Sequence, residues 1–241
     1  MSKRRAVDQF DLAGRLVGYA TSTRYRVRGD FLFAGIPLAG AHLLEVGCGT
    51  GAWGIWAALH GAHRVIGIEP EATGSSPGTL ATFQQIVATL GLGEQIEATE
   101  HSLQEFPIPE RPFDVVIMYN VINHLDEEAV VVLHRDAEAF ARYVSILQNL
   151  RLLMRSDGWV VVADCMRDNF WPRLGLHSPF APGIEWSKHQ SPHTWIDIFE
   201  HAGFQSFDLR WSPLQPFPKL TANRFVQWLT CSHFVLRLRA R

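Results

Sequence analysis

A strand-like run followed by alternating glycines has the clearest chemical meaning in this sequence. Residues 43–46 (LLEV) lead directly into Gly-Cys-Gly-Thr-Gly at 47–51, and a helical pattern begins at Ala52. Glycines at such a turn can adopt positive φ angles and let a ligand approach the backbone closely. A second strand-like run, 64–68, ends in Glu69, whose carboxylate can accept hydrogen bonds from both hydroxyls of a ribose. Together they predict a nucleotide site at the carboxyl ends of two strands.

Two cofactors fit this pattern. Residues 49–54 match Gly-x-Gly-x-x-Gly, and Glu69 follows Gly49 by 20 residues, which is the spacing of a dinucleotide site. Three features favour S-adenosylmethionine: Glu45 lies two residues before the first glycine, a leader precedes residue 41, and the tail suits a reversed last strand. The leader could cover the methionine end of the ligand. A glycine-rich turn without any ligand is the third alternative.

The composition describes a globular chain with balanced charge. Its 241 residues are 47% hydrophobic and 19% charged, and correspond to one large domain or one domain with an insertion. The formal net charge of −2 argues against a nucleic-acid partner, because such partners require an excess of basic side chains. Three scattered cysteines read as reduced thiols. With no secretory signal and no apolar run of about 20 residues, we expect a cytoplasmic protein without a membrane partner.

Strand-like and helix-like segments alternate along the chain, which predicts an α/β fold. The expected sheet is Rossmann-like and doubly wound, mostly parallel with an antiparallel last strand, and has helices on both faces. The expected strands are 42–46, 64–68, 95–99, 113–119, 158–164, 204–211 and 232–239. The expected helices are 52–60, 79–90, 127–154 in two pieces, 193–201 and a short one near 222–229.

The expected domain plan is a leader or cap over residues 1–40 and a cofactor-binding domain over 41–241. Two insertions, near 167–191 and 212–224, are too long to be simple turns. Residues 170–234, which include most of both insertions, hold 13 of the 27 aromatic residues. These aromatics either pin the loops to the sheet edge or form a lid over a substrate.

The motifs resemble those of a known family. LLEVGCGTGAWG at 43–54, followed by VIGIEP at 65–70, resembles the class I S-adenosylmethionine-dependent methyltransferases. FDVVIMYNVINHL at 113–125 resembles the fourth-strand segment of that family. LLMRSDGW at 152–159 resembles the turn into its fifth strand, and AGF at 202–204 matches the turn into its sixth. The resemblance covers about residues 25–240. It implies S-adenosylmethionine as cofactor and S-adenosylhomocysteine as product.

The resemblance implies a role for each matching position. Glu45 would orient the glycine loop or the amino group of the ligand, and Gly47, Gly49 and Gly51 would let the backbone contact the methionine part. Glu69 would hold the ribose hydroxyls. The full set of expected cofactor contacts is Tyr25, Arg28, Glu45, Gly47, Cys48, Gly49, Gly51, Glu69, Pro70, Ser102, Leu103 and Asn120.

The remaining implied contacts come from other segments. Ser102 and Leu103 would flank the adenine, and the backbone carbonyl of Asn120 would line the site. Tyr25 and Arg28 are either ligands of the cofactor carboxylate or ordinary surface residues. The sequence departs from the family at Ser102, where members often carry an aspartate nearby, and in a longer connection at 71–78.

The acceptor is expected to be a small molecule, methylated at a hydroxyl of a metabolite or sugar. Residues 120–123 (NVIN) lack the Pro-Pro-aromatic motif that grips a planar amine in similar enzymes. His124, just past the fourth strand, is the candidate general base, because an imidazole titrates near neutral pH. The alternative is a histidine that only packs or caps a helix start.

Four residues of the first insertion are candidate substrate contacts, with a surface loop as the alternative: Trp171, Glu185, Trp186 and His189. His189 and His193 have a spacing that suits a metal on a helix, but Pro192 between them is expected to start a new helix, so no metal site is predicted. The alternatives for the whole chain are an NAD(P)-dependent oxidoreductase, although no Tyr-x-x-x-Lys pair is in place, and a non-catalytic cofactor-binding protein.

Overall fold

The computed structural model describes residues 3–70, 78–214 and 217–241. The described chain forms two compact units, Met1–Ile117 and Met118–Arg241. This division differs from the expected leader at 1–40 and domain at 41–241, which stays a prediction. The expected long connection at 71–78 lies almost entirely outside the described residues, as does part of the insertion at 212–224.

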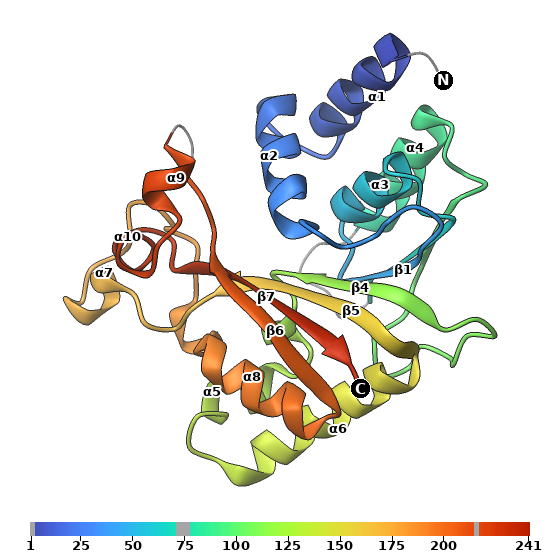
Figure 1. Ribbon diagram of the computed structural model, residues 1–241. Coiled ribbons are helices and arrows are strands. Elements are labelled where there is room, and N and C mark those ends of the chain that lie inside the picture. Colours follow the sequence, from blue (N-terminus) through green and yellow to red (C-terminus); the bar gives the residue numbers. More distant parts are fainter. Residues whose placement is uncertain (1–2, 71–77, 215–216) are drawn as a thin grey trace. The chain divides into compact units, whose positions relative to one another are not determined.

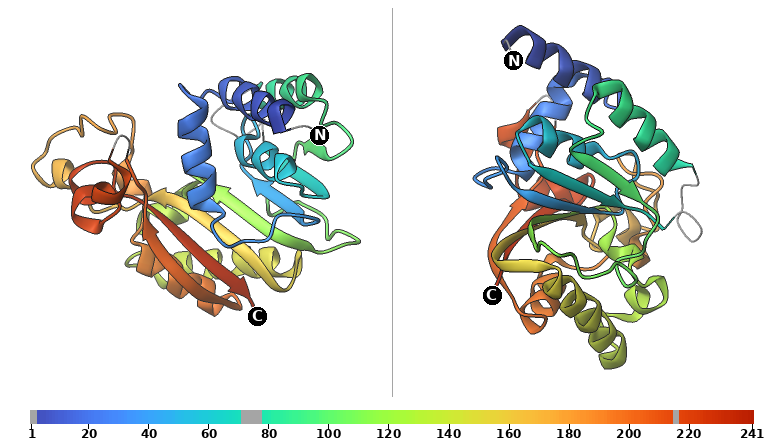
Figure 2. Two further views of the ribbon diagram at one scale, coloured as in Figure 1. Left: turned by 45° about the horizontal axis from the view of Figure 1, so that its top comes forward. Right: turned by 90° about the vertical axis from the view of Figure 1, so that its right-hand side faces the viewer.

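The first unit is a parallel sheet with helices packed on it (Figure 1). Strand β1 pairs with β2 and β2 pairs with β3, all in parallel. Helix α3 packs on β1 and β2, α4 packs on β3, and α1 contacts α2, α3 and α4; Figure 2 shows α1 beside α4. Its elements are α1 (Lys3–Leu16), α2 (Ser22–Leu32), β1 (His42–Val46), α3 (Ala52–Leu59), β2 (Arg64–Ile68), α4 (Thr79–Leu90) and β3 (Ile96–Thr99).

The second unit combines an antiparallel strand pair with helices. Strand β7 pairs antiparallel with both β5 and β6, α6 packs on β5, and α8 packs on β6 and β7. Its helices are η1 (Ile122–His124), α5 (Glu127–Val132), α6 (Ala137–Leu152), α7 (Phe170–Arg173), η2 (Trp186–Lys188), α8 (Pro192–His201), α9 (Pro218–Thr221) and α10 (Arg224–Leu229). Its strands are β5 (Met154–Cys165), β6 (Phe204–Trp211) and β7 (His233–Ala240), and β4 (Phe113–Tyr119) spans the boundary.

The strand order is β3-β2-β1-β4-β5-β7-β6. The predicted fold class, an α/β Rossmann-like sheet that is mostly parallel with an antiparallel last strand, is confirmed. Every residue of β1 is buried, as expected for a central strand covered on both faces. Helix α4 has its predicted bounds and ends at Gly91, whose φ of 67° closes the helix in a left-handed conformation.

The predicted division of 127–154 into two helices is confirmed, because Asp126 and Asp136 each accept a hydrogen bond from a backbone N–H and cap a separate start. Two other predicted boundaries were wrong. Strand β5 begins at Met154 instead of Gly158. Its early start was not predicted, because residues 155–157 are exposed and polar and carry no strand pattern in the sequence. The helix expected near 222–229 begins at Arg224, after its cap Asn223.

Candidate functional site

Glu45 fixes the end of the glycine loop in the first unit by hydrogen bonds to the helix that follows it. It is the fourth residue of β1 and is 2% exposed. Its Oε1 accepts the backbone N–H of Trp53 at 3.1 Å, and its Oε2 accepts that of Gly54 at 2.7 Å. Both N–H groups belong to the first turn of α3, where no helical carbonyl can reach them. The geometry therefore favours the first of its two expected roles, orientation of the loop.

The charge of Glu45 is balanced between opposing effects. Burial raises the pKa of Glu45, and the nearby Glu69 carboxylate raises it further, while hydrogen bonds from the N–H groups of Gly54 and Trp53 lower it. Together these effects place the pKa of Glu45 at about 8. A carboxyl group in a low-dielectric interior resists ionisation unless donors compensate it. The first unit thus holds a carboxyl that titrates near neutral pH directly under the loop.

Two glycines of the loop have different physical requirements. Gly51 has φ 75°, and a Cβ there would lie 1.9 Å from a ring carbon of Phe83, so packing excludes a side chain. Gly49 has φ 49°, but a Cβ there would meet no atom within 4 Å. The backbone at Gly49 therefore borders open space, as a turn that lets a ligand approach requires.

Glu69 joins the end of β2 to the same loop. Its Oε2 accepts the backbone N–H of Gly49 at 2.9 Å. No other described residue donates to this half-buried carboxylate, so it retains further acceptor positions. The N–H of Cys48 donates to the carbonyl of Ile68 at 3.0 Å, which ties the loop to β2 a second time. Cys48 itself is buried, and its Sγ would lie 3.0 Å from a Cβ at Gly67.

Tyr25 and Arg28 lie on α2 and differ in what they can offer. Tyr25 is fully buried against Trp53 and Trp56, and its hydroxyl donates to the carbonyl of Ala52 at 2.6 Å. Burial raises the pKa of Tyr25 well above its ordinary value. Arg28 is half-buried, and its Nη1 is buried without a partner among the described residues. Arg28 therefore has an unmatched donor that a carboxylate would satisfy.

The segment expected to border the adenine is mostly engaged within itself. The Ser102 hydroxyl donates to Oε2 of Glu105 at 2.7 Å and accepts the N–H of the same residue. Leu103 is 3% exposed and Pro70 is half-buried. Leu103 and Pro70 thus have apolar side chains, whereas the Ser102 hydroxyl already has a partner within its own turn.

Asn120 ends β4 in a left-handed conformation. Its φ is 55°, a left-handed value that asparagine tolerates better than most residues other than glycine. Its N–H donates to the carbonyl of Ala163 at 2.7 Å, and its Oδ1 lies 3.2 Å from Nε2 of His233. The other ring nitrogen of His233 lies 2.7 Å from the hydroxyl of Ser212. The strained backbone is thus fixed from two strands and one insertion.

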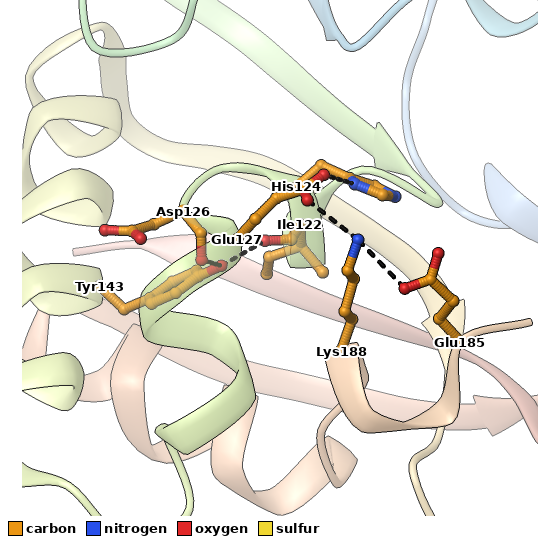
Figure 3. Close-up of polar contacts among 7 residues, drawn as sticks. All are labelled: Ile122, His124, Asp126, Glu127, Tyr143, Glu185 and Lys188. Atoms are coloured by element: carbon orange, nitrogen blue, oxygen red, sulfur yellow. Dashed lines mark hydrogen bonds and ion pairs between the residues drawn. The ribbon is translucent and has the colours of Figure 1, made fainter. Parts of the chain in front are cut away.

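His124 ends η1 and meets a carboxylate from the next helix (Figure 3). Its Nδ1 lies 2.8 Å from Oε1 of Glu127, and Oε2 of Glu127 lies 2.9 Å from Nζ of Lys188. Nζ of Lys188 also lies 3.2 Å from Oε2 of Glu185. When Nδ1–H donates to Glu127, the lone pair of the neutral imidazole is on Nε2. The His124 side chain is 39% exposed.

Glu127 stays ionised at the centre of this chain of contacts. Hydrogen bonds from His124 and then from Lys188 lower the pKa of Glu127, and burial opposes them only weakly. The same carboxylate raises the pKa of Lys188. Tyr143, on α6, supports the turn, because its hydroxyl lies 3.1 Å from the carbonyl of Ile122 and 3.2 Å from that of Asp126 (Figure 3).

Comparison with known proteins identifies the family. Residues 19–208 match the model of a family described as a methyltransferase domain. The chain belongs to this methyltransferase family. The predicted family, the class I S-adenosylmethionine-dependent methyltransferases, is confirmed, and S-adenosylmethionine is its cofactor. The nicotinamide-dependent oxidoreductase that the glycine spacing also allowed is left without support.

Curated relatives of this methyltransferase align with part of it. A ubiquinone biosynthesis O-methyltransferase of Xylella fastidiosa strain 9a5c is 31% identical over 107 residues, which are 44% of this chain and 40% of the relative. A tRNA U34 carboxymethyltransferase of Aeromonas hydrophila is 35% identical over 89 residues, 36% of this chain and 25% of the relative. The chain thus spans less than half the length of the curated relatives it matches.

Solved methyltransferase structures share the fold over nearly the whole chain. An S-adenosylmethionine-dependent methyltransferase from Aquifex aeolicus has a TM-score of 0.63 at 13% identity and covers 95% of this chain and 98% of its own. One from Mesorhizobium loti has a TM-score of 0.60 at 16% identity, over 93% of this chain and 99% of its own. At these identities the likeness shows the fold alone.

The expected substrate contacts of this methyltransferase are anchored in different ways. The indole N–H of Trp171 donates to the carbonyl of Leu229 at 2.8 Å, so Trp171 joins the first insertion to α10. His189 is buried, with Nδ1 3.1 Å from Oδ1 of Asp164, whereas Glu185 is exposed and Trp186 half-exposed. Only Glu185 belongs to the contacts around His124. The substrate role of all four stays a prediction.

Pro192 starts α8, as predicted, and separates the buried His189 from the exposed His193. Within the described ranges, no three histidine, cysteine or acidic side chains gather as a metal site. In the same part of the chain, no helix is long and apolar enough to cross a membrane.

The sequence prediction did not include Glu127, and it named Lys188 only as a polar group of a pocket, without a link to His124. Glu127 had a local signal, since it follows His124 by three residues at a helix start, where two side chains can meet. Lys188 had none, because 61 residues separate it from Glu127.

Proposed function

We propose that this chain transfers a methyl group from S-adenosylmethionine to a hydroxyl of a small-molecule acceptor, with His124 as general base. The observation that carries the proposal is the 2.8 Å contact between His124 Nδ1 and Glu127 Oε1. A base is required when the acceptor atom must lose a proton, as a hydroxyl does. The O-methyltransferase named among the relatives supports the same acceptor atom.

Residues of the first unit fit the cofactor. Arg28 would bind the carboxylate of its amino-acid part, because Nη1 is buried and unmatched among the described residues. Glu69 would accept from the ribose, Gly49 would border the methionine part, and Leu103 would contact the adenine. The bound cofactor supplies an electrophilic methyl group on a sulfonium.

His124 would take the hydroxyl proton at Nε2. Glu127 holds the ring through Nδ1, fixes the tautomer with a free Nε2 and stabilises the imidazolium that results. A positioned base typically accelerates such a step by about 10²- to 10⁴-fold. The orientation by Glu127 adds to this, because the reacting atoms must be aligned for an in-line displacement.

The cofactor part of the proposal is tested by binding. S-Adenosylhomocysteine should raise the melting temperature of the wild type, and NAD should not. Arg28→Met should weaken S-adenosylhomocysteine binding about tenfold in calorimetry, because it removes one charge-assisted hydrogen bond. The melting temperature of the free variant should stay near that of the wild type. Stabilisation by NAD alone, or unchanged affinity in Arg28→Met, would contradict these assignments.

The base is tested by turnover with methyl-labelled cofactor on a panel of phenols, sugars and bulk tRNA. His124→Asn should lower turnover at least 100-fold without changing S-adenosylhomocysteine affinity. His201→Asn is a matched control, because His201 also pairs with a carboxylate on its own helix, Asp197 at 3.3 Å, and is exposed. Full turnover in His124→Asn would remove the base. Methylation of tRNA alone would replace the small-molecule acceptor with the class named for the second relative.

A further inference from the structure

Lys188 enters the environment of His124 from the first insertion. It is the last residue of η2, and its Nζ reaches the oxygen of Glu127 that His124 leaves free (Figure 3). The following residues are firmly placed: His189 is bonded to the buried Asp164, and the Gln190 amide donates to the carbonyl of Val130 at 2.6 Å. The backbone of Lys188 is therefore anchored, although the ion pair itself is at the surface.

The two oxygens of Glu127 have separate partners. Oε1 faces Nδ1 of His124 and Oε2 faces Nζ of Lys188, so the carboxylate cannot rotate without losing one contact. An isolated ion pair on the surface contributes little to stability, about 0–1 kcal/mol. The value of this pair is orientational, because it directs one defined oxygen at the histidine ring.

Several charged groups lie around the carboxylate that His124 and Lys188 share. Helix α5 contacts η1, η2 and α6. The charged or titratable groups on or beside these elements are His124, Asp126, Glu127, Glu128, His134, Arg135, Asp136, Glu138, Arg142, Tyr143, Arg151, Glu185, Lys188 and His189. Asp126 contacts Arg142 at 2.5 Å, whereas Glu127 is the carboxylate that contacts both His124 and Lys188.

We propose that Lys188 is a positioning residue for the general base: it holds the second oxygen of Glu127 and keeps the first on Nδ1 of His124. This inference rests on the proposed role of His124 as base. It makes the first insertion part of the catalytic apparatus and not only a cover for the acceptor.

The test measures the His124 ring directly, by NMR of the full chain labelled with ¹⁵N and ¹³C in histidine. The His124 signals are assigned with His124→Asn. In the wild type the ¹⁵N shifts of the neutral ring should show Nδ1 protonated and Nε2 unprotonated, and Lys188→Met should lower the population of this tautomer, because Glu127 Oε1 is then no longer held on Nδ1. Lys188→Arg should restore it. Arg173→Met is the matched control, because Arg173 pairs with Asp168 at 2.7 Å in the same insertion and is exposed.

Turnover gives the second readout. Lys188→Met should lower kcat about threefold to tenfold with an unchanged KM for the cofactor, and should have no further effect in Glu127→Gln. An unchanged His124 tautomer population in Lys188→Met, or an equal loss of it in Arg173→Met, overturns the inference. The two failures are distinguishable: full turnover in His124→Asn removes the base, whereas lost turnover there with an unchanged tautomer population in Lys188→Met removes only the role of Lys188.

Discussion

Replacing Glu45 with glutamine should remove a pH dependence of stability that comes from one buried carboxyl. Burial raises the pKa of Glu45 to about 8 in the folded chain, against an ordinary value of 4.5. Between these two values the unfolded chain is ionised at this position while the folded chain holds a proton. The free energy of unfolding therefore falls as pH rises through this window, and levels off below 4.5 and above about 8.

The size of the effect follows from the width of the window. Each unit of pKa difference corresponds to about 1.4 kcal/mol, so the wild type should lose on the order of 5 kcal/mol between pH 4.5 and 8. Glutamine cannot ionise and removes this slope. It also places an NH₂ group against one of the two N–H donors of Trp53 and Gly54, which costs about 1–3 kcal/mol at every pH.

Urea unfolding followed by tryptophan fluorescence, at intervals from pH 5 to 9, measures both effects. Relative to the wild type, Glu45→Gln should be the less stable protein at pH 5 and should gain several kcal/mol by pH 9. Glu97→Gln is a suitable control, because Glu97 is 53% exposed in its side chain and pairs with Arg64 at the surface. Parallel curves for wild type and Glu45→Gln would refute the reasoning, since they would mean that the carboxyl is ionised throughout.

Substitutions at Gly51 and Asp208 test the packing inside the first and the second unit, respectively. Gly51→Ala should destabilise the fold by about 3 kcal/mol or more, because the added Cβ would overlap the Phe83 ring. Gly78→Ala is the control and should cost about 1 kcal/mol, because Gly78 also has a positive φ at a helix start but borders open space. Equal losses in thermal unfolding would contradict this. Asp208→Ala should cost about 1–3 kcal/mol, because it removes the carboxylate that accepts hydrogen bonds from the buried Arg237. Burial raises the pKa of Asp208, but Arg237 lowers it by more, and the net result is a pKa below the ordinary 3.8. The stability that the ion pair contributes is therefore present above pH 3.8 and is lost as the pH falls further. An acid transition that is unchanged in Asp208→Asn would be inconsistent with the pair.

Three elements of the first unit were predictable because each is a mainly apolar run followed by a glycine or a charged residue. Strands β1 and β2 and helix α4 have their predicted bounds. A buried strand is apolar in nearly every residue, and Gly91 marks the end of a helix by its conformation. The start of β5 was not predictable, because residues 155–157 belong to the strand although their side chains are exposed.

The site was predictable only where it is built from backbone. A turn that presents N–H groups to a ligand is built from consecutive residues, so Glu45 and Gly47–Gly51 can be recognised together as one short sequence motif. Individual side-chain roles were less visible. The Ser102 hydroxyl is used within its own turn, and the Tyr25 hydroxyl is used by α3, while both had been expected to face the cofactor.

The surroundings of His124 follow the opposite rule. Glu127 and Lys188 reach one another from positions 61 residues apart, and Lys188 comes from an insertion that the shared motifs do not include. A ligand of fixed size constrains the spacing of a glycine loop and an acid that both bind it. The residues around the proposed base have no such constraint, so they can come from any loop that reaches His124. The same insertion that supplies Lys188 also supplies Glu185 and Trp186. We therefore expect changes in this loop to alter acceptor choice and the orientation of His124 together.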